Sequence, residues 1–84
     1  MDRVLDRLFI GSAVDLDGRV PLHVLGFSAV VDLRDVDRPV ELLPGVAVHR
    51  LSNRDGDPWT VVDVEVALDF VHQHVQRGRV LVAC

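Results

Sequence analysis

The chain's single cysteine is its last residue, and it follows an apolar run. The segment RVLVAC ends at Cys84. A short run of this kind is typical of a buried strand, and in α/β sheets ligands bind beyond the carboxyl ends of the strands. A thiolate at such a position is a candidate nucleophile. Because cysteine is also a small apolar side chain suited to a core, the sequence leaves two roles open for Cys84: nucleophile or packing residue.

A polar loop upstream of the cysteine holds two aspartates around a glycine. It reads NRDGDP and contains Asp55 and Asp57. The loop lies between a predicted strand that ends at Leu51 and a predicted helix, again at the carboxyl end of a strand. Asp55 has no evident capping role, so it is either a candidate general acid or a solvated turn residue. Asp57 precedes a proline, which makes it a candidate helix cap or the alternative acid.

Strands and helices alternate along the rest of the chain. Apolar, β-branched segments predict strands at 4–10, 28–34, 46–51 and 80–84. The first of these reads as one strand or as a tight strand pair that closes at Gly11. Strands separated by helices favour an α/β fold whose sheet is mostly parallel, with helices in the crossovers.

Two helices are predicted between these strands. The clearer one spans 60–77, where Thr60 and Asp63 match a capping box. Its apolar stripe consists of Val64, Ala67, Leu68, Val71 and Val75. The other helix is predicted to begin at Asp17 as N-cap and to stop at Gly26. Because a parallel sheet needs helices on both faces, one face is expected to stay open and apolar, and self-association through that face is expected.

Composition and charge narrow the class of protein. The chain has 84 residues, enough for one small domain, with 49% hydrophobic and 26% charged residues, as in globular proteins. A net charge of −4 argues against nucleic acid as a partner. The sequence has neither an apolar run near the ~20 residues of a membrane span nor the features of a signal peptide, so a cytoplasmic protein without a membrane partner is predicted. The histidines lack metal-ligand spacing, and no metal or cofactor is predicted.

Segments in order along the chain resemble the dual-specificity branch of the cysteine-based protein tyrosine phosphatases. LFIGSAVD is similar to that family's opening strand and turn, and LGFSAVVDLRD looks like its helix end and central strand. NRDGDP stands where the family keeps its mobile acid loop, and ALDFVHQHVQRGRVLVAC is similar to the helix and strand that present the nucleophile. The resemblance covers nearly the whole chain. It implies a single truncated domain over 1–84, an incomplete phosphatase-like fold with a mostly parallel central sheet, flanking helices and the C-terminal helices missing.

The resemblance also implies a mechanism and a substrate class. Cys84 matches the nucleophile that forms a phosphocysteine, and Asp55 is the better match for the general acid by its distance from the cysteine, with Asp57 as the fallback. The implied substrate is a phosphorylated protein, on tyrosine or on serine and threonine, or a small phosphoester. In the same family view, Arg34 beside Asp35 is interpreted as an architectural ion pair.

The chain departs from the family's pattern in two places. The family has a histidine directly before the cysteine, where this chain has Ala83, and the family's phosphate-binding loop and its arginine follow the cysteine, where this chain has no residues. The 84-residue chain alone is therefore expected to be inactive. Two alternatives stay open. The first is a non-catalytic pseudophosphatase fragment that binds a partner. The second is a rhodanese-like sulfurtransferase, because the segment VVDLRD also resembles the early strand of that fold.

Overall fold

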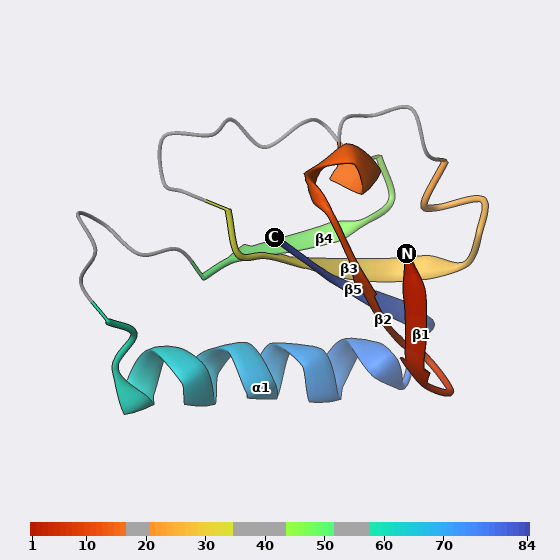
Figure 1. Cartoon of the computed structure of the whole chain (residues 1–84). Helices are drawn as coiled ribbons and strands as arrows, with labels where there is room; N and C mark the ends of the chain where they lie inside the picture. Colours follow the sequence, from red (N-terminus) through yellow and green to blue (C-terminus); the bar gives the residue numbers. More distant parts are fainter. Residues whose placement is uncertain (17–20, 35–43, 52–57) are drawn as a thin grey trace.

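A five-stranded mixed sheet with an α-helix against one face forms the fold (Figure 1). The computed structural model describes residues 1–16, 21–34, 44–51 and 58–84. The elements are β1 (Asp2–Leu5), β2 (Leu8–Gly11), the 3-10 helix η1 (Ala13–Leu16), β3 (Phe27–Asp32), β4 (Ala47–Arg50), α1 (Val61–Val75) and β5 (Arg79–Ala83). The strand order across the sheet is β1-β2-β5-β3-β4, which places the last strand of the chain in the middle.

The strand pairing confirms the predicted α/β class and the mostly parallel sheet. β2, β5, β3 and β4 are parallel neighbours, and only β1 runs antiparallel, beside β2. Of the two interpretations of residues 4–10, the tight strand pair is correct, because a turn at Asp6 and Arg7 separates β1 from β2. The described part of the chain contains one α-helix rather than the flanking helices predicted.

The capping box predicted for α1 is present. The Asp63 backbone N–H donates to Thr60 Oγ1 at 3.1 Å, and the Thr60 backbone N–H donates to Asp63 Oδ2 at 2.9 Å. These bonds satisfy donors that every helix start leaves open, and the hydrogen bonds from Thr60 lower the pKa of the Asp63 carboxyl. Because Thr60 is the N-cap, the helix-cap alternative for Asp57 does not hold for α1.

The face that α1 turns to the sheet matches the predicted stripe only in part: Ala67 is buried and Val71 and Val75 are half-buried, while Val64 and Leu68 are exposed. Ala67 is buried, and the Phe70 ring lies 5.2 Å from the ring of His49 on β4 and 4.4 Å from that of His74. The Ser28 hydroxyl donates to the His74 carbonyl at 2.9 Å, which ties β3 to the helix. Leu68, by contrast, is 61% exposed. The contacts of the Phe70 ring set the rotation of α1 about its axis, so one side of the predicted apolar stripe faces solvent.

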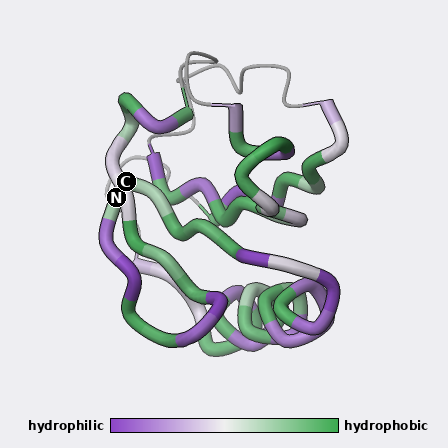
Figure 2. Tube along the Cα trace, turned by 90° about the vertical axis from the view of Figure 1, so that its right-hand side faces the viewer, coloured by the Kyte–Doolittle hydropathy of each residue, from purple (hydrophilic) through white to green (hydrophobic). Residues whose placement is uncertain are grey.

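The opposite face of the sheet carries the main core. Leu16 of η1 and Leu22 pack there on buried side chains of β3 and β5, and the Phe9 and Phe27 rings meet edge to face with centroids 5.1 Å apart. Figure 2 shows these green segments above the sheet and α1 below it. The expectation of one entirely open face is therefore wrong at the centre of the sheet, since η1 and residues 21–26 cover the face that α1 leaves.

Residues 21–26 form a single turn instead of the predicted helix. Asp17, the predicted N-cap, lies outside the described residues. The turn ends in a Schellman motif: the Phe27 N–H donates to the Leu22 carbonyl at 2.9 Å and the Gly26 N–H to the His23 carbonyl at 3.1 Å. Gly26 has φ +88°, which only glycine adopts readily, so the predicted stop is correct. The turn has no buried helical stripe, because Leu22 alone of its apolar side chains enters the core.

Candidate functional site

Cys84 lies at the carboxyl end of β5, between the ends of two parallel strands. Its backbone N–H donates to the Gly11 carbonyl at the end of β2, at 3.4 Å, and the Leu33 N–H beyond β3 donates to the Ala83 carbonyl at 2.7 Å. The cysteine is exposed and carries a free thiol. Both roles that the sequence left open for Cys84, nucleophile and packing residue, stay predictions.

The two candidate acids, Asp55 and Asp57, lie outside the described residues. The residues on either side of them are placed. The Leu51 N–H, directly after β4, donates to the Asp32 carbonyl at 2.9 Å, and Thr60 begins α1 on the side of the sheet where β3 and β4 end (Figure 1). The chain therefore leaves β4 and enters α1 at the same edge of the sheet that carries Cys84.

A buried aspartate that sequence analysis did not single out organises this edge. Asp32 ends β3 with its side chain fully buried. Arg34 binds it with both ends of its guanidinium, Nε to Oδ1 at 2.9 Å and Nη2 to Oδ2 at 3.0 Å, and Arg34 also donates its backbone N–H to Oδ1 at 2.9 Å. Nε of Arg50, on β4, lies 3.5 Å from Oδ2. One carboxylate thus joins the end of β3, the residues after it and the end of β4.

Arg34 binds Asp32, and the ion pair predicted between Arg34 and Asp35 stays a prediction. Asp35 lies outside the described residues. The signal for Asp32 was available in the sequence: side chains two apart on an extended strand share a face, and a carboxylate inside the apolar run SAVVDL needs a partner once that run is buried.

Electrostatics at Asp32 predict how the chain's stability depends on pH. Burial alone would raise the pKa of this carboxyl, but the hydrogen bonds from Arg34 and the charges of Arg34 and Arg50 hold the pKa below its usual value. The ion pair therefore contributes its full stability above the pKa of the unfolded chain, about 3.9, and loses it as the pH falls through the lower pKa of the folded chain.

We expect the difference in free energy of unfolding between the chain and its Asp32→Asn variant to narrow as the pH falls below about 4. Urea denaturation at several pH values from about 7 to 3 measures it. The other acidic residues are the same in both proteins, so the comparison isolates the contribution of Asp32. A difference that stays constant over this range would show that Asp32 is not held ionised by its arginines.

The parts of the chain that the structure describes contain no set of side chains suited to bind a metal ion. No group of three or more His, Cys, Asp or Glu side chains there could hold a metal ion. At this edge the described residues offer an exposed thiol after β5 and, at the end of β3, a buried carboxylate bound by arginine.

Comparisons with known proteins do not assign the chain to a family. No family model matches the chain, and neither the curated proteins nor the solved structures contain a match. None of the helices that the structure describes is both long enough and apolar enough to cross a membrane. The structure itself supports a small α/β fold with a mixed five-stranded sheet.

Proposed function

We propose that this chain is the nucleophile-bearing part of a phosphatase domain of the dual-specificity type. The observation that supports it best is the position of Cys84: an exposed thiol at the carboxyl end of the central parallel strand, flanked by the ends of β2 and β3. The order of segments that resembles the family adds Asp55 as the general acid, with Asp57 as the fallback. The substrate is then a phosphorylated protein or a small phosphoester.

The proposed reaction has two steps. In the first, Sγ of Cys84 bonds to phosphorus while the bond from phosphorus to the ester oxygen breaks, and the aspartic acid gives its proton to that oxygen. In the second, the aspartate takes a proton from water, the water oxygen bonds to phosphorus, and the sulfur–phosphorus bond breaks to restore the thiolate. Backbone N–H groups and an arginine must hold the phosphate. In the family these follow the cysteine, so the activity belongs to a protein that continues beyond Cys84.

The native transcript gives the first test. Continuation beyond codon 84 into the pattern x-x-Gly-x-x-Arg, followed by Ser or Thr, supports the proposal. A stop codon directly after Cys84 contradicts the catalytic role for the natural protein, and the partner-binding alternative then takes its place.

Hydrolysis of p-nitrophenyl phosphate gives the second test. The 84-residue chain should show no more hydrolysis than its Cys84→Ser variant. In the continued protein, Cys84→Ser should lower kcat by at least about a thousandfold and Asp55→Asn by roughly a hundredfold or more. Asp57→Asn is the matched control, and a loss confined to that variant would move the acid role to Asp57. Turnover of thiosulfate instead of phosphoester would favour the rhodanese-like alternative.

A partner-binding fragment is the second candidate function. The observation that favours it is an apolar surface beside α1, where Leu5, Ile10 and Leu68 are exposed together with other large apolar side chains. Exposed apolar area that is more than scattered single residues marks interaction sites. This candidate needs no residues after Cys84 and no catalytic acid.

A further inference from the structure

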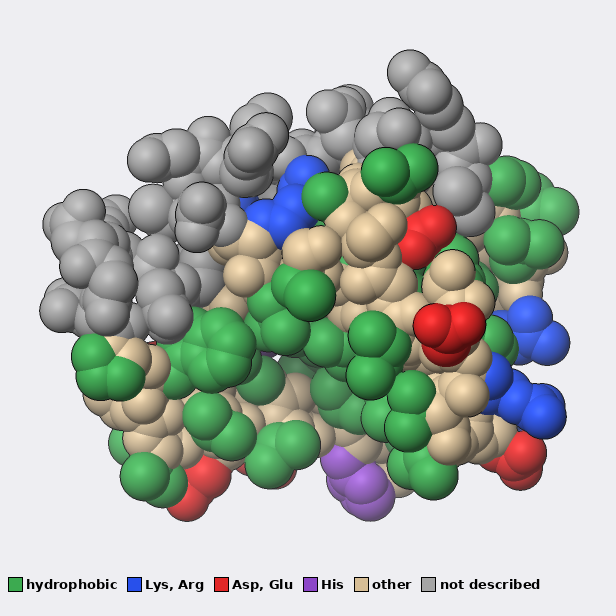
Figure 3. Space-filling view, viewed as in Figure 1, with side chains coloured by type: hydrophobic (Ala, Val, Ile, Leu, Met, Phe, Trp, Pro, Cys, Tyr) green, Lys and Arg blue, Asp and Glu red, His purple; other side chains and the backbone are tan. Residues whose placement is uncertain are grey.

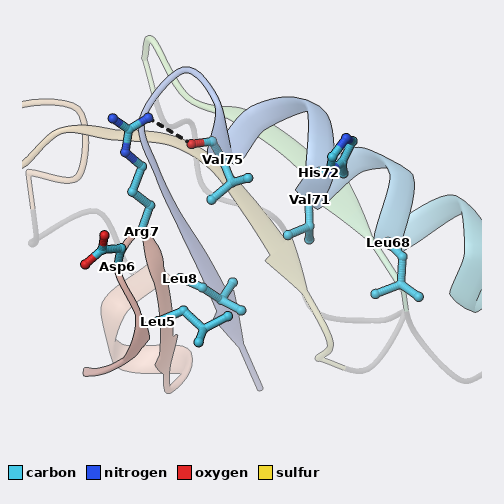
Figure 4. Close-up of a pocket in the computed structure, with 8 residues that line it drawn as sticks. All are labelled: Leu5, Asp6, Arg7, Leu8, Leu68, Val71, His72 and Val75. Atoms are coloured by element: carbon cyan, nitrogen blue, oxygen red, sulfur yellow. Dashed lines mark hydrogen bonds between the residues drawn. The ribbon is translucent and has the colours of Figure 1, made fainter.

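An open apolar groove runs between α1 and the β1–β2 hairpin. Its apolar lining consists of Leu5 and Leu8 from the hairpin and Leu68, Val71 and Val75 from α1. The groove has a volume of about 540 Å³. Figure 4 shows the leucines of the hairpin and the apolar flank of α1 on its two sides.

The groove exists because α1 covers only part of its face of the sheet. The helix packs on β3 and β5, and the next strand, β2, keeps Ile10 half exposed. Leu8 and Ile10 are two residues apart on β2, so their side chains share one face of the sheet, the face toward the groove. Arg7 spans one end, where its Nη1 donates to the Val75 carbonyl at 3.1 Å and to the Gln76 carbonyl at 3.3 Å.

The spacing of the elements suits a second helix beside α1. Neighbouring strands lie about 4.8 Å apart, and packed helices lie about 8–10 Å apart. A second helix whose axis lies about 8–10 Å from the axis of α1, on the side of the hairpin, would lie over β2 and β1. There it would cover three of the exposed apolar side chains, Leu5 and Ile10 on the sheet and Leu68 on α1.

Carboxylates surround this apolar surface. Asp6 lines the groove, and Asp2 pairs with Ile10 across β1 and β2, so both side chains share the groove's face. On α1, Glu65 and Asp69 are exposed beside Leu68. Figure 3 shows apolar side chains (green) gathered over this region, with acidic side chains (red) toward both ends and basic side chains (blue) among them on the right.

The basic groups at the groove do not balance these acids. The guanidinium of Arg7 is bound to the carbonyls at the end of α1, and the other basic group in the lining is His72. The occupant that complements this site in charge is therefore positive on both sides of an apolar stripe.

We propose that the groove binds a basic amphipathic helix of a protein partner, with its apolar stripe against Leu5, Leu8 and Leu68 and its arginines or lysines toward Asp2, Asp6 and Glu65. Binding of this kind is the helix-in-groove mode of recognition. A second copy of the chain is a poor match, because the chain carries a net charge of −4 and its own α1 presents Asp63, Glu65 and Asp69. None of these residues takes part in the proposed phosphatase mechanism. If the protein continues beyond Cys84 into C-terminal helices, those helices are a competing occupant of the groove, and loss of peptide binding in the continued protein would overturn the inference.

Two synthetic helices test the proposal on the 84-residue chain. Both have about 18 residues and the same leucine stripe, one with arginine and one with glutamate at the flanking positions, and fluorescence anisotropy measures their Kd. Exposed ion pairs each change affinity only a few-fold, so several of them should make the arginine peptide bind roughly tenfold more tightly at about 50 mM salt. This preference should shrink as the salt concentration rises.

Variants on α1 locate the binding. Leu68→Ser should weaken the arginine peptide about tenfold, while Val62→Ser, at a side chain that is 65% exposed and does not line the groove, should leave its Kd unchanged. The double variant Glu65→Lys with Asp69→Lys should reduce the preference for arginine over glutamate. Circular dichroism checks that each variant is folded.

Three further outcomes would overturn the proposal. The first is equal affinity for the two peptides at low salt. The second is a Leu68→Ser variant that binds as the original chain does. The third is sedimentation that reveals a dimer abolished by Leu68→Ser, because the groove would then be covered by a second copy, in line with the self-association predicted from the sequence.

Discussion

Replacing Asp32 with alanine is expected to lower the free energy of unfolding by roughly 3–5 kcal/mol, which is the usual cost of removing one partner of a buried ion pair. The Arg34 and Arg50 guanidiniums would lose their shared carboxylate while lying largely inside the fold, with side chains 12% and 28% exposed. Partial access of water to Arg50 places the effect toward the lower end of that range. The Arg34 backbone N–H would also lose its acceptor.

A loss of this size is large for so small a chain. Domains have a total stability of about 5–15 kcal/mol, and short ones lie near the bottom of that range. Urea denaturation followed by circular dichroism would measure the change, with Asp69→Ala as the control because Asp69 is an exposed acid on α1. If the two variants differed by less than about 0.5 kcal/mol, the view of Asp32 as the organiser of the sheet edge would be wrong.

Replacing Leu81 with alanine is expected to cost about 2–5 kcal/mol. Leu81 is fully buried in the centre of β5, opposite Phe9 of β2 and Val30 of β3 in the two strand pairings. The shorter side chain removes apolar contacts and leaves a cavity that strands on both sides prevent from closing.

The same denaturation experiment measures this effect. Val24→Ala is the matched control, because Val24 is exposed in the turn before β3 and should change stability by less than about 0.5 kcal/mol. A Leu81→Ala variant as stable as the control would mean that the two halves of the sheet do not share one core through β5.

The sheet was predictable because its signals are local. The apolar runs of β3 and β5 match buried parallel strands, and the Thr60 capping box fixes the start of α1 within its own first turn. Gly26 ends the turn before β3 for the same local reason, its positive φ. Strand order was not predictable, because it depends on which strands pair across the whole chain.

The parts that sequence analysis missed depend on tertiary contacts. Periodicity assigned one apolar stripe to α1, but contact of Phe70 with His49 on a distant strand sets which side of the helix meets the sheet. The turn at residues 21–26 has a helical pattern, yet the core accepts only Leu22 from it. At the candidate site, the position of Cys84 at the edge where the parallel strands end was predictable from the direction of the strand that precedes it. The binding of Asp32 by arginines from two segments was not, since Arg50 reaches it only through the pairing of β3 with β4.

The central position of β5 constrains how this chain can be made. β2 and β3 are not neighbours in the sheet, and both pair with β5, which follows the other described elements in the sequence. Arg7 likewise contacts the end of α1 across a sequence separation of 68 residues. Such long-range contacts slow folding and leave strand edges unpaired in the meantime. During translation, the hairpin and the β3–β4 pair therefore stay separate, with unpaired strand edges that favour aggregation, until β5 has left the ribosome.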